Sequence, residues 1–362
     1  MSSKQKKEPR KKIDINNDNK EAQLELIKKA IVKKYGNVMS KLSDYNDILI
    51  QTISSGCIGL DLAMGRGGFA RGRIYEVYGP NSSGKTTLAL NAVIQAQKRG
   101  LKACFIDAEH SADRELFKNY GVDIEALDII QGYDGEANLD ILEKLVRTGA
   151  YDIAVVDSVS ALIPRSEAEA DIDKEFMGLH ARLMSKALRR LAPLADEVNC
   201  LIIFINQLRM KIGSYGDPTT TTGGEALGFY SSGRIFVRGP EAKARRIVDS
   251  VTGDVIGHTT EFEMIKNKLS SPFKKATVNL IYGNGYDLYT ELVDLAVSVG
   301  IIDKAGSWYK YNGESIGQGS IGVVKYLKEY QDIHGEIRKK VLELLGIDKI
   351  YNEQVDSLEE TN

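Results

Sequence analysis

One segment, GPNSSGKT at residues 79–86, limits what this chain can fold into more than any other. It fits the pattern G-x-x-x-x-G-K-[ST], in which a glycine-rich turn and a helix N-terminus direct backbone N–H groups at phosphate oxygens. The apolar run IYEVY precedes it, and the helical pattern TTLALNAVIQAQKR follows it and stops at Gly100. The sequence therefore predicts a strand, a phosphate-binding turn and a helix. A glycine-rich turn without a ligand is the alternative.

The residues of this turn have specific predicted roles in nucleotide binding. Lys85 is expected to reach the β- and γ-phosphates, and Thr86 is expected to bind Mg²⁺ through its hydroxyl. ATP and Mg²⁺ are therefore the expected ligands. The residues predicted to contact the nucleotide here are Gly79, Pro80, Asn81, Ser82, Ser83, Gly84, Lys85, Thr86 and Thr87.

Polar side chains follow three further strand candidates, ACFID, IAVV and LIIFI. Ligands of an open parallel sheet bind beyond the carboxyl ends of its strands, so these side chains are candidates for a hydrolytic site. Asp157 is expected to hold Mg²⁺, and Glu109 to activate the attacking water as general base. Gln207, which follows Asn206, is predicted to hydrogen-bond the γ-phosphate. Taken singly, Asp157 would be assigned to a helix cap, Glu109 to a solvated carboxylate and Gln207 to a structural amide. One ATP site accounts for all three residues together.

Composition and patterning set broader limits on the fold. From about Ile53 to Met264, short apolar runs alternate with helical patterns, which predicts an α/β fold with a mostly parallel twisted sheet flanked by helices. No apolar run approaches the ~18 residues of a membrane span, and the N-terminus has no signal-peptide core, so a cytoplasmic protein is expected. The net charge is −2, so any nucleic acid must be held by local patches. The three cysteines are too scattered to suggest a disulfide framework or a zinc site.

Changes of pattern divide the chain into five expected segments. In order, these are a disordered basic tail (1–20), an N-terminal helical segment (21–50), the ATPase core (51–282), a small α+β C-terminal domain (283–350) and a disordered acidic tail (351–362). Leu24, Ile27 and Tyr35 recur at helical spacing in the second segment. Asn312 and Gly313 predict a tight hairpin turn in the C-terminal domain.

Several segments, taken in order, closely resemble those of bacterial RecA-type recombinases. They are GPNSSGKTT, FIDAEH, VVDSVSAL, FINQLRMKIG, the TTTGG before EALGFYSS, and IKNKLSSPFK, within a match from about Glu21 to about Leu345. The resemblance implies a RecA-like ATPase core, an N-terminal helix that packs on a neighbouring protomer, and a C-terminal domain that helps to admit duplex DNA. It also implies ATP-dependent helical filaments on single-stranded DNA, homologous pairing and strand exchange in recombinational repair. A LexA-like repressor, stimulated to cleave itself in the SOS response, and loading proteins are the further partners implied.

The resemblance carries over to individual residues. It gives the phosphate-site residues the roles already described. Lys266 and Lys268 match lysines that reach the neighbouring protomer's ATP, and Phe229 matches an aromatic that couples adjacent subunits. Without the resemblance, the two lysines would be assigned to a solvated strand edge.

The base site and one inserted segment depart from the family pattern. Asp113, Phe117 and Tyr282 are expected to frame the adenine, but Leu116 stands where the family commonly has an aromatic residue, which weakens stacking. The segment at 239–255 is longer than its counterpart and clusters basic residues, and it has no assigned role beyond a basic hairpin.

Two loops match the family's DNA-binding loops. The first, at 164–178, is acidic, and the match points instead to Met177 as an apolar wedge between bases, with Arg182 and Arg189 as phosphate ligands. The second combines charge, an aromatic surface and small donors, which grips a DNA backbone without reading bases. Its predicted contacts are Arg209, Lys211, Tyr215, Thr221, Thr222, Gly223 and Gly224. A solvated acidic face and a mobile linker are the alternatives.

Three other functions are compatible with parts of this pattern. One is a RecA-fold relative such as a helicase or a branch-migration ATPase, although the chain has a single phosphate-binding motif and no N-terminal cysteine zinc motif. Another is a mainly regulatory nucleoprotein filament. The third is a small-molecule kinase, which needs neither the Thr/Gly loop nor the lysines at 266 and 268.

Overall fold

The computed structural model divides the chain into two compact units, Met1–Ile50 and Gln51–Asn362. The residues that it describes are 17–36, 38–39, 41, 50–171, 176, 178–210, 219–240, 245–249 and 251–348. The first unit contains the expected helix as α1 (Asn17–Tyr35), on which Leu24, Ile27 and Tyr35 are exposed. The expected disordered tails at 1–20 and 351–362 lie outside the described residues, apart from the first turn of α1.

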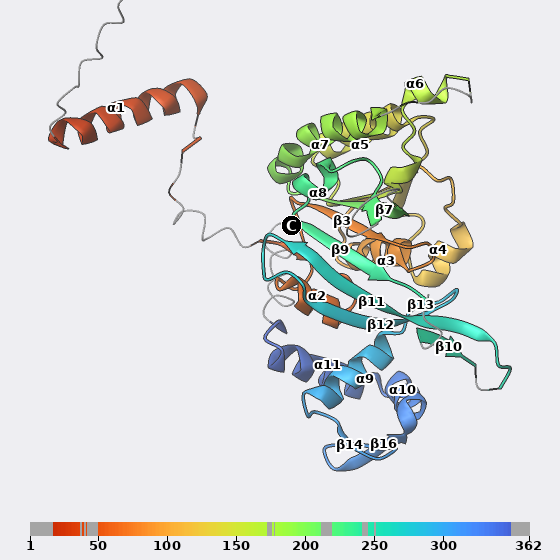
Figure 1. The fold of residues 1–362 in the computed structure, drawn as a ribbon. Coiled ribbons are helices and arrows are strands. Elements are labelled where there is room, and N and C mark those ends of the chain that lie inside the picture. The colour runs from red at the N-terminus through yellow and green to blue at the C-terminus, as the bar shows by residue number, and fades with distance from the viewer. Residues whose placement is uncertain are drawn as a thin grey trace, which may run out of the picture. The chain divides into compact units, whose positions relative to one another are not determined.

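The second unit is built on a sheet whose central strands are parallel (Figure 1). The strand order is β5-β4-β6-β7-β3-β9-β11-β12-β13, with parallel pairing from β5 to β9. The mostly parallel sheet is therefore confirmed, and the four strands expected at IYEVY, ACFID, IAVV and LIIFI are present. The parallel strands are β3 (Ile74–Gly79), β4 (Ala103–Asp107), β5 (Leu127–Ile130), β6 (Ile153–Asp157), β7 (Leu201–Met210) and β9 (Gly233–Arg238).

An antiparallel extension follows β9 and was not anticipated from the sequence. Along β11 the buried residues alternate with partly exposed ones, because one face of this strand covers the core and the other meets solvent. Figure 1 shows the β10–β11 hairpin projecting beyond the sheet, and it contains much of the basic segment at 239–255. The strands of the extension are β10 (Arg246–Val248), β11 (Val255–Asn267), β12 (Lys275–Ile281) and β13 (Gly285–Tyr286).

Helices cover both faces of the parallel part of the sheet. Figure 1 shows α5 and α7 on one face and α3 on the other. Leu142 of α5 and Leu188 of α7 pack with Val156 and Phe204 of the sheet in one fully buried cluster. The larger helices are α3 (Lys85–Gln97), α5 (Gly135–Arg147) and α7 (Leu179–Glu197). Shorter elements of the core are β1 (Thr52–Ile53), α2 (Ile58–Met64), β2 (Phe69–Ala70), α4 (Arg114–Tyr120), the 3₁₀ helix η2 (Val159–Ala161), α6 (Arg165–Ala168), β8 (Thr219–Thr221) and α8 (Ala226–Tyr230).

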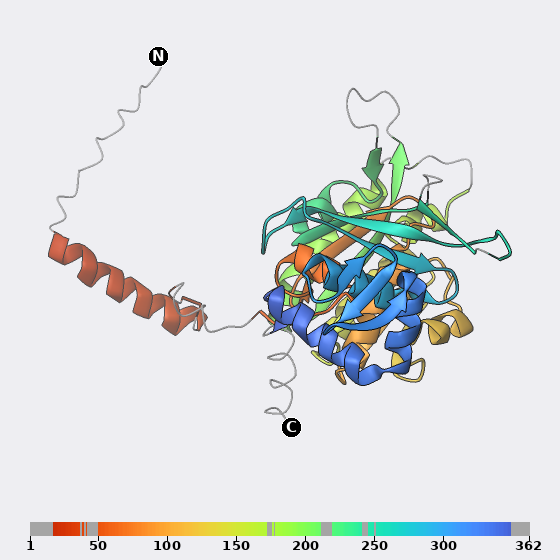
Figure 2. The same ribbon diagram turned by 90° about the horizontal axis from the view of Figure 1, so that it is seen from below.

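The C-terminal elements form a separate hydrophobic cluster. Figure 2 shows them, in blue, against the sheet on the side of α2 and β12. Asn312 and Gly313 both have positive φ, 50° and 84°, which fits the predicted tight turn. Buried Glu291 accepts hydrogen bonds from the backbone N–H groups of Ile58 (3.2 Å) and Gly59 (2.9 Å), and so ties this domain to α2. Its elements are α9 (Leu288–Ser298), β14 (Asp303–Ala305), β15 (Trp308–Tyr311), β16 (Glu314–Gln318), α10 (Gly319–Glu329) and α11 (Gln331–Leu344).

Two helices of this domain differ from expectation. The helical spacing of apolar residues at 336–345 predicts one final helix there, whereas α11 begins at Gln331 and α10 precedes it. The glycines at the start of α10 disfavour a helix, and the burial of Val323 and Leu327 overrides that preference. None of the helices in the described ranges has the length and apolar character needed to cross a membrane.

Candidate nucleotide and DNA site

The predicted phosphate-binding turn joins β3 to α3, as expected. A Cβ atom on Gly79 would lie 2.1 Å from the carbonyl oxygen of Val237, and Gly84 has a φ of 96°, which strains any other residue, so both positions require glycine. The Nζ atom of Lys85 donates a hydrogen bond to the carbonyl oxygen of Pro80 at 2.6 Å. Burial lowers the pKa of Lys85, while the carboxylates of Asp157 and Glu109 act in the opposite direction. The lysine is thus held over the turn that would receive the phosphates.

Thr86 and Asp157 form the predicted metal-binding pair. The Oγ1 atom of Thr86 donates to Oδ2 of Asp157 at 2.7 Å. Burial raises the pKa of Asp157 to about 6, and the hydrogen bond from Thr86 opposes that rise. Both groups offer oxygen atoms, which Mg²⁺ prefers, and Mg²⁺ commonly uses few protein ligands together with substrate phosphates. The pair therefore fits Mg²⁺. Within the described ranges, no three His, Cys, Asp or Glu side chains are grouped as a protein-only metal site would require.

Glu109, just after β4, meets Gln207, which lies near the carboxyl end of β7. The Nε2 atom of Gln207 donates to Oε1 of Glu109 at 2.9 Å, and the same oxygen accepts the hydroxyl of Ser158. The backbone N–H groups of Ala108 (2.8 Å) and Glu109 (3.3 Å) bond to the carbonyl oxygen of Asp157, which holds the two loops together. The general-base candidate and the γ-phosphate candidate therefore share one site with Asp157.

Sequence reasoning missed two residues that support this site. Ser158 follows Asp157 across a cis peptide bond and holds Glu109. Asp107 is fully buried and accepts from the backbone N–H groups of Ser111 and Ala112, both at 3.0 Å, so it fixes the loop that carries Glu109. Their positions, at a strand end or just after one, were the available signals.

A buried hydrogen-bond network links Gln207 to Thr222, at the far end of the predicted second DNA loop. Oδ1 of Asn206 accepts from the Gln207 N–H at 2.9 Å and from the Thr222 hydroxyl at 2.7 Å. Nδ2 of Asn206 donates to Glu76 Oε1 at 2.9 Å and to the Thr222 carbonyl at 3.0 Å. Glu76 in turn accepts from Arg234. The lone glutamate within the apolar run IYEVY was the sequence signal for this network.

The strand that leads into the second DNA loop is longer than expected. The sequence predicted a strand at 201–205, but β7 continues to Met210 and pairs with β8, so Arg209 lies opposite Thr220. Backbone hydrogen bonds to β8 keep the chain in strand conformation past Asn206 and Gln207, where the sequence predicted that the strand would end. Asn206 and Gln207 therefore lie within a strand rather than after one.

The predicted DNA contacts have different surroundings. Arg182 and Arg189 are exposed on α7, as is Arg209 at the end of β7, and Thr221 is half-buried. Thr222 and Gly223 are buried, and the Thr222 hydroxyl already bonds to Asn206, while Gly224 is exposed. Met177, Lys211 and Tyr215 lie outside the described residues. DNA contact by all of these residues stays a prediction.

The predicted interface residues lie together near α8. Nζ of Lys266 donates to the carbonyl oxygens of Gly228 (2.7 Å) and Phe229 (3.0 Å), at the negative end of α8. Lys268 is exposed, and Phe229 is 70% exposed. Burial is the main cause that lowers the pKa of Lys266, and the nearby charge of Lys268 adds to it.

Of the three predicted base-site residues, Phe117 is buried on α4, and the other two lie on different elements. Asp113 caps α4 by accepting a hydrogen bond from the Leu116 N–H at 2.7 Å. Tyr282 follows β12, and its hydroxyl lies 3.2 Å from Nδ1 of His258. Contact of either residue with a base stays a prediction.

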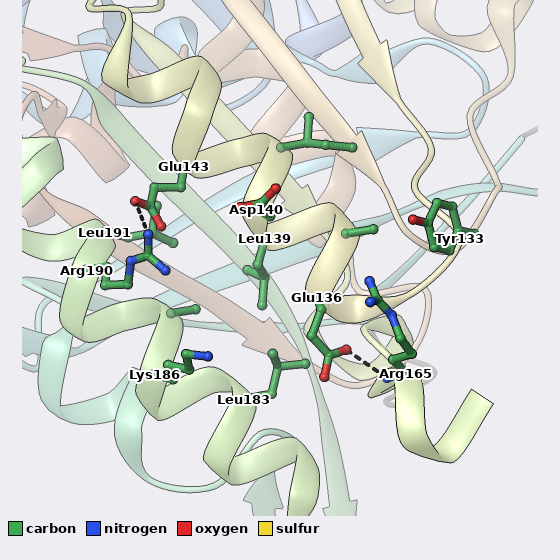
Figure 3. Close-up of a pocket in the computed structure, with 13 residues that line it drawn as sticks. Tyr133, Glu136, Leu139, Asp140, Glu143, Arg165, Leu183, Lys186, Arg190 and Leu191 are labelled. Atoms are coloured by element: carbon green, nitrogen blue, oxygen red, sulfur yellow. Dashed lines mark hydrogen bonds and ion pairs between the residues drawn. The ribbon is translucent and has the colours of Figure 1, made fainter. Parts of the chain in front are cut away.

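A cavity of about 380 Å³ between α5 and α7 contains none of the residues of the phosphate-binding turn (Figure 3). Figure 3 shows the ion pair between Arg190 and Glu143, with Nη2 and Oε1 2.7 Å apart. It also shows the Arg165 N–H donating to Oε2 of Glu136 at 2.7 Å. Because Arg165 lies at the start of the predicted first DNA loop, the cavity wall anchors the start of that loop to α5.

Family models and known proteins match almost the whole chain. The family model of the RecA N-terminal domain matches residues 21–287, and that of the RecA C-terminal domain matches residues 290–346. Protein RecA of Listeria monocytogenes serotype 1/2a (strain 10403S) is 46% identical over 346 residues, covering 95% of this chain and 98% of that protein. Protein RecA of Listeria seeligeri gives the same identity and coverage.

Among solved structures, the crystal structure of the RadB recombinase aligns with a TM-score of 0.49 and 23% identity, over 65% of this chain and 98% of that chain. The RecA matches determine the family, because both family domains occur in order and the alignment covers 98% of the relatives' length. The chain therefore belongs to the RecA family of DNA recombinases.

Proposed function

We propose that this chain hydrolyses ATP with Mg²⁺ to assemble as a helical filament on single-stranded DNA, pairs that DNA with a homologous duplex and exchanges strands. RecA family membership implies a nucleotide-binding, DNA-dependent ATPase that binds DNA and self-associates. The observation that carries the finer proposal is the convergence of Lys85, Asp157, Glu109 and Gln207 on one end of the sheet, with Gln207 two residues before Arg209.

The proposed chemistry assigns one task to each residue around the phosphates. Lys85 and the N–H groups of the turn bind the phosphate chain, while Thr86 and Asp157 would hold Mg²⁺. Mg²⁺, when bound, neutralises charge that develops on the phosphate oxygens. Glu109 takes a proton from the attacking water, and Ser158 keeps its carboxylate in place.

Gln207 is proposed to couple γ-phosphate binding to the conformation of the DNA loop. Its amide bonds to Glu109 here, and a γ-phosphate would compete for the same N–H group. The change would pass to the loop through the strand and through Asn206, which bonds both to the Gln207 backbone and to Thr222. Thr222 thus acts as an anchor of the loop.

The protomer interface is proposed to complete the ATP site. Lys266 and Lys268 would reach the neighbouring protomer's γ-phosphate, where positive charge stabilises the transition state. Lys266 would exchange its carbonyl partners on α8 for phosphate oxygens, which links ATP to the position of Phe229. The exposed apolar residues of α1 suit packing on another protomer.

The division of the chain into an N-terminal segment, an ATPase core and a C-terminal domain at 50/51 and 282/283 is part of the proposal. So are a cytoplasmic location, stimulated self-cleavage of a LexA-like repressor by the filament, and binding of loading proteins. Incubating the ATP-bound filament with a purified LexA-like repressor tests the stimulated self-cleavage, and intact repressor would count against it.

Addition of single-stranded DNA should raise ATP turnover by roughly tenfold or more, because assembly brings lysines from a neighbour to each ATP. Turnover is measured as phosphate release with and without DNA, and strand exchange is measured in parallel between a circular single strand and a linear duplex. Turnover and pairing that do not respond to DNA would reject the proposed function. Turnover that instead responds to a small phosphoryl acceptor would favour a small-molecule kinase.

Substituting Gln207→Ala should leave ATP affinity within about threefold of wild type and abolish most of the ATP-dependent gain in DNA affinity. On ATP binding the Gln207 amide exchanges one charged acceptor, the Glu109 carboxylate, for another, the γ-phosphate, so its removal costs little ATP affinity but breaks the connection to the loop. DNA binding is measured by fluorescence anisotropy with ADP and with a non-hydrolysable ATP analogue.

Gln97→Ala is the matched control, since Gln97 ends α3 and bonds to Asp123, away from the phosphates. It should retain the full response to ATP. If Gln207→Ala lowers DNA affinity equally with both nucleotides, the coupling role is wrong.

A further inference from the structure

A polar seam, formed by Ser83, His258 and Thr260, lies behind the phosphate-binding turn. His258 and Thr260 are both fully buried and stand two residues apart on β11, so they point to the same side of the strand. The Ser83 backbone interacts with His258, and a Cβ atom on Gly84 would lie 3.5 Å from Oγ1 of Thr260. The two β11 residues therefore lie against residues 83 and 84 of the turn.

His258 also contacts Tyr282, which lies beyond the end of β12. Nδ1 of His258 is 3.2 Å from the Tyr282 hydroxyl, and the ring centroids are 5.6 Å apart at an angle of 53°. Tyr282 is 47% exposed, so its ring has a free side toward solvent. The histidine thus stands between the turn and the exposed tyrosine.

The chemistry of the buried imidazole suits a link between these two groups. Burial lowers the pKa of His258, so the ring is neutral at pH 7, with one N–H donor and one acceptor nitrogen. With the proton on Nε2, Nδ1 accepts from the Tyr282 hydroxyl. Nε2 has no hydrogen bond of normal geometry among the described residues. Its proton is therefore free to point toward the turn.

We propose that His258 is a nucleotide-positioning residue, which fixes Tyr282 against the base of the bound nucleotide and ties it to the phosphate-binding turn at Ser83. The proposal rests on the proposed function, which places ATP on the turn with its base at Tyr282. An exposed tyrosine loses side-chain freedom when a base packs on it, and a partner that fixes the ring beforehand reduces that cost. Because the base does not react, the effect falls on KM and Kd rather than on kcat.

The test compares ATP with tripolyphosphate, which has the phosphates but no base. Tyr282→Phe and His258→Leu should each weaken ATP binding by about three- to tenfold, the loss expected for one hydrogen bond. The double variant should bind no more weakly than the weaker single variant, because both changes remove the same interaction. Tripolyphosphate affinity and kcat should stay within about twofold of wild type.

His258→Asn supplies a rescue, because its amide oxygen stands close to the position of Nδ1 and can accept from Tyr282. This variant should bind ATP more tightly than His258→Leu. Tyr282→Phe keeps the ring at an exposed position, so it remains informative if His258→Leu fails to fold. Binding is measured by titration calorimetry.

Two results would overturn the inference. Additive losses in the double variant would show that the two residues act separately, and an equal loss for tripolyphosphate would show general damage to the turn. Both of these results can be obtained only if the wild-type protein binds ATP. If the wild type binds tripolyphosphate and ATP equally or binds neither, the placement of the base or of the nucleotide is wrong, and the proposed function fails at that step.

Discussion

Lys85→Ala should abolish measurable ATP turnover, with an expected loss on the order of 10²–10³-fold or more. The ammonium group is buried over the turn, 2.6 Å from the Pro80 carbonyl, and is the cation next to the predicted phosphate positions. Removing it leaves the charge that develops on the phosphates without its fixed counter-charge. Because the same group binds the ground state, KM for ATP should also rise. Phosphate release at saturating ATP and DNA measures both effects.

Lys98→Ala is the matched control for this prediction. Lys98 is exposed at the C-terminal end of the same helix, so the substitution removes the same charge at the opposite end of α3. It should leave turnover within about twofold of wild type, as an exposed position without a specific contact allows. Turnover of a folded Lys85→Ala protein within threefold of wild type would contradict the assigned role.

The grouping of side chains at the candidate phosphate site could be predicted from the sequence because these residues lie close to strand ends. Each of Lys85, Glu109, Asp157 and Gln207 lies within a few residues of an apolar run, and parallel pairing brings the carboxyl ends of those runs to one edge. The short separation in sequence between each residue and a strand therefore predicts that its side chain lies at this edge of the sheet. The family resemblance added the lysines at 266 and 268, which local patterns alone assign to a strand edge.

The supporting contacts could not be predicted, because they depend on register between distant segments. Asn206 meets Thr222 only because β7 runs on to pair with β8, and Ser158 meets Glu109 only because β4 and β6 are neighbours. Nothing in the alternation of apolar residues specifies which strands become neighbours. The same limit applies to α10, whose glycine-rich start hides a helix that packing stabilises.

Glu109→Gln should lower ATP turnover by roughly 10²–10⁴-fold, the contribution expected of a general base. The substitution keeps the size of the side chain and an oxygen that accepts from Ser158, but the amide cannot take a proton from water. ATP binding should persist, because the residues that hold the phosphates are unchanged. Single-turnover hydrolysis and ATP binding are measured separately to distinguish the two steps.

The consequence for DNA binding sets this variant apart from Lys85→Ala. If ATP binding orders the DNA loop through Gln207 and hydrolysis releases it, Glu109→Gln should hold DNA for much longer in the presence of ATP, whereas Lys85→Ala should not respond to ATP. Glu115→Gln, at an exposed position in the first turn of α4, should behave as wild type. A Glu109→Gln protein that loses ATP binding together with turnover would place this carboxylate in nucleotide binding. Rapid release of DNA by a variant that still binds ATP would show instead that hydrolysis does not control the DNA loop.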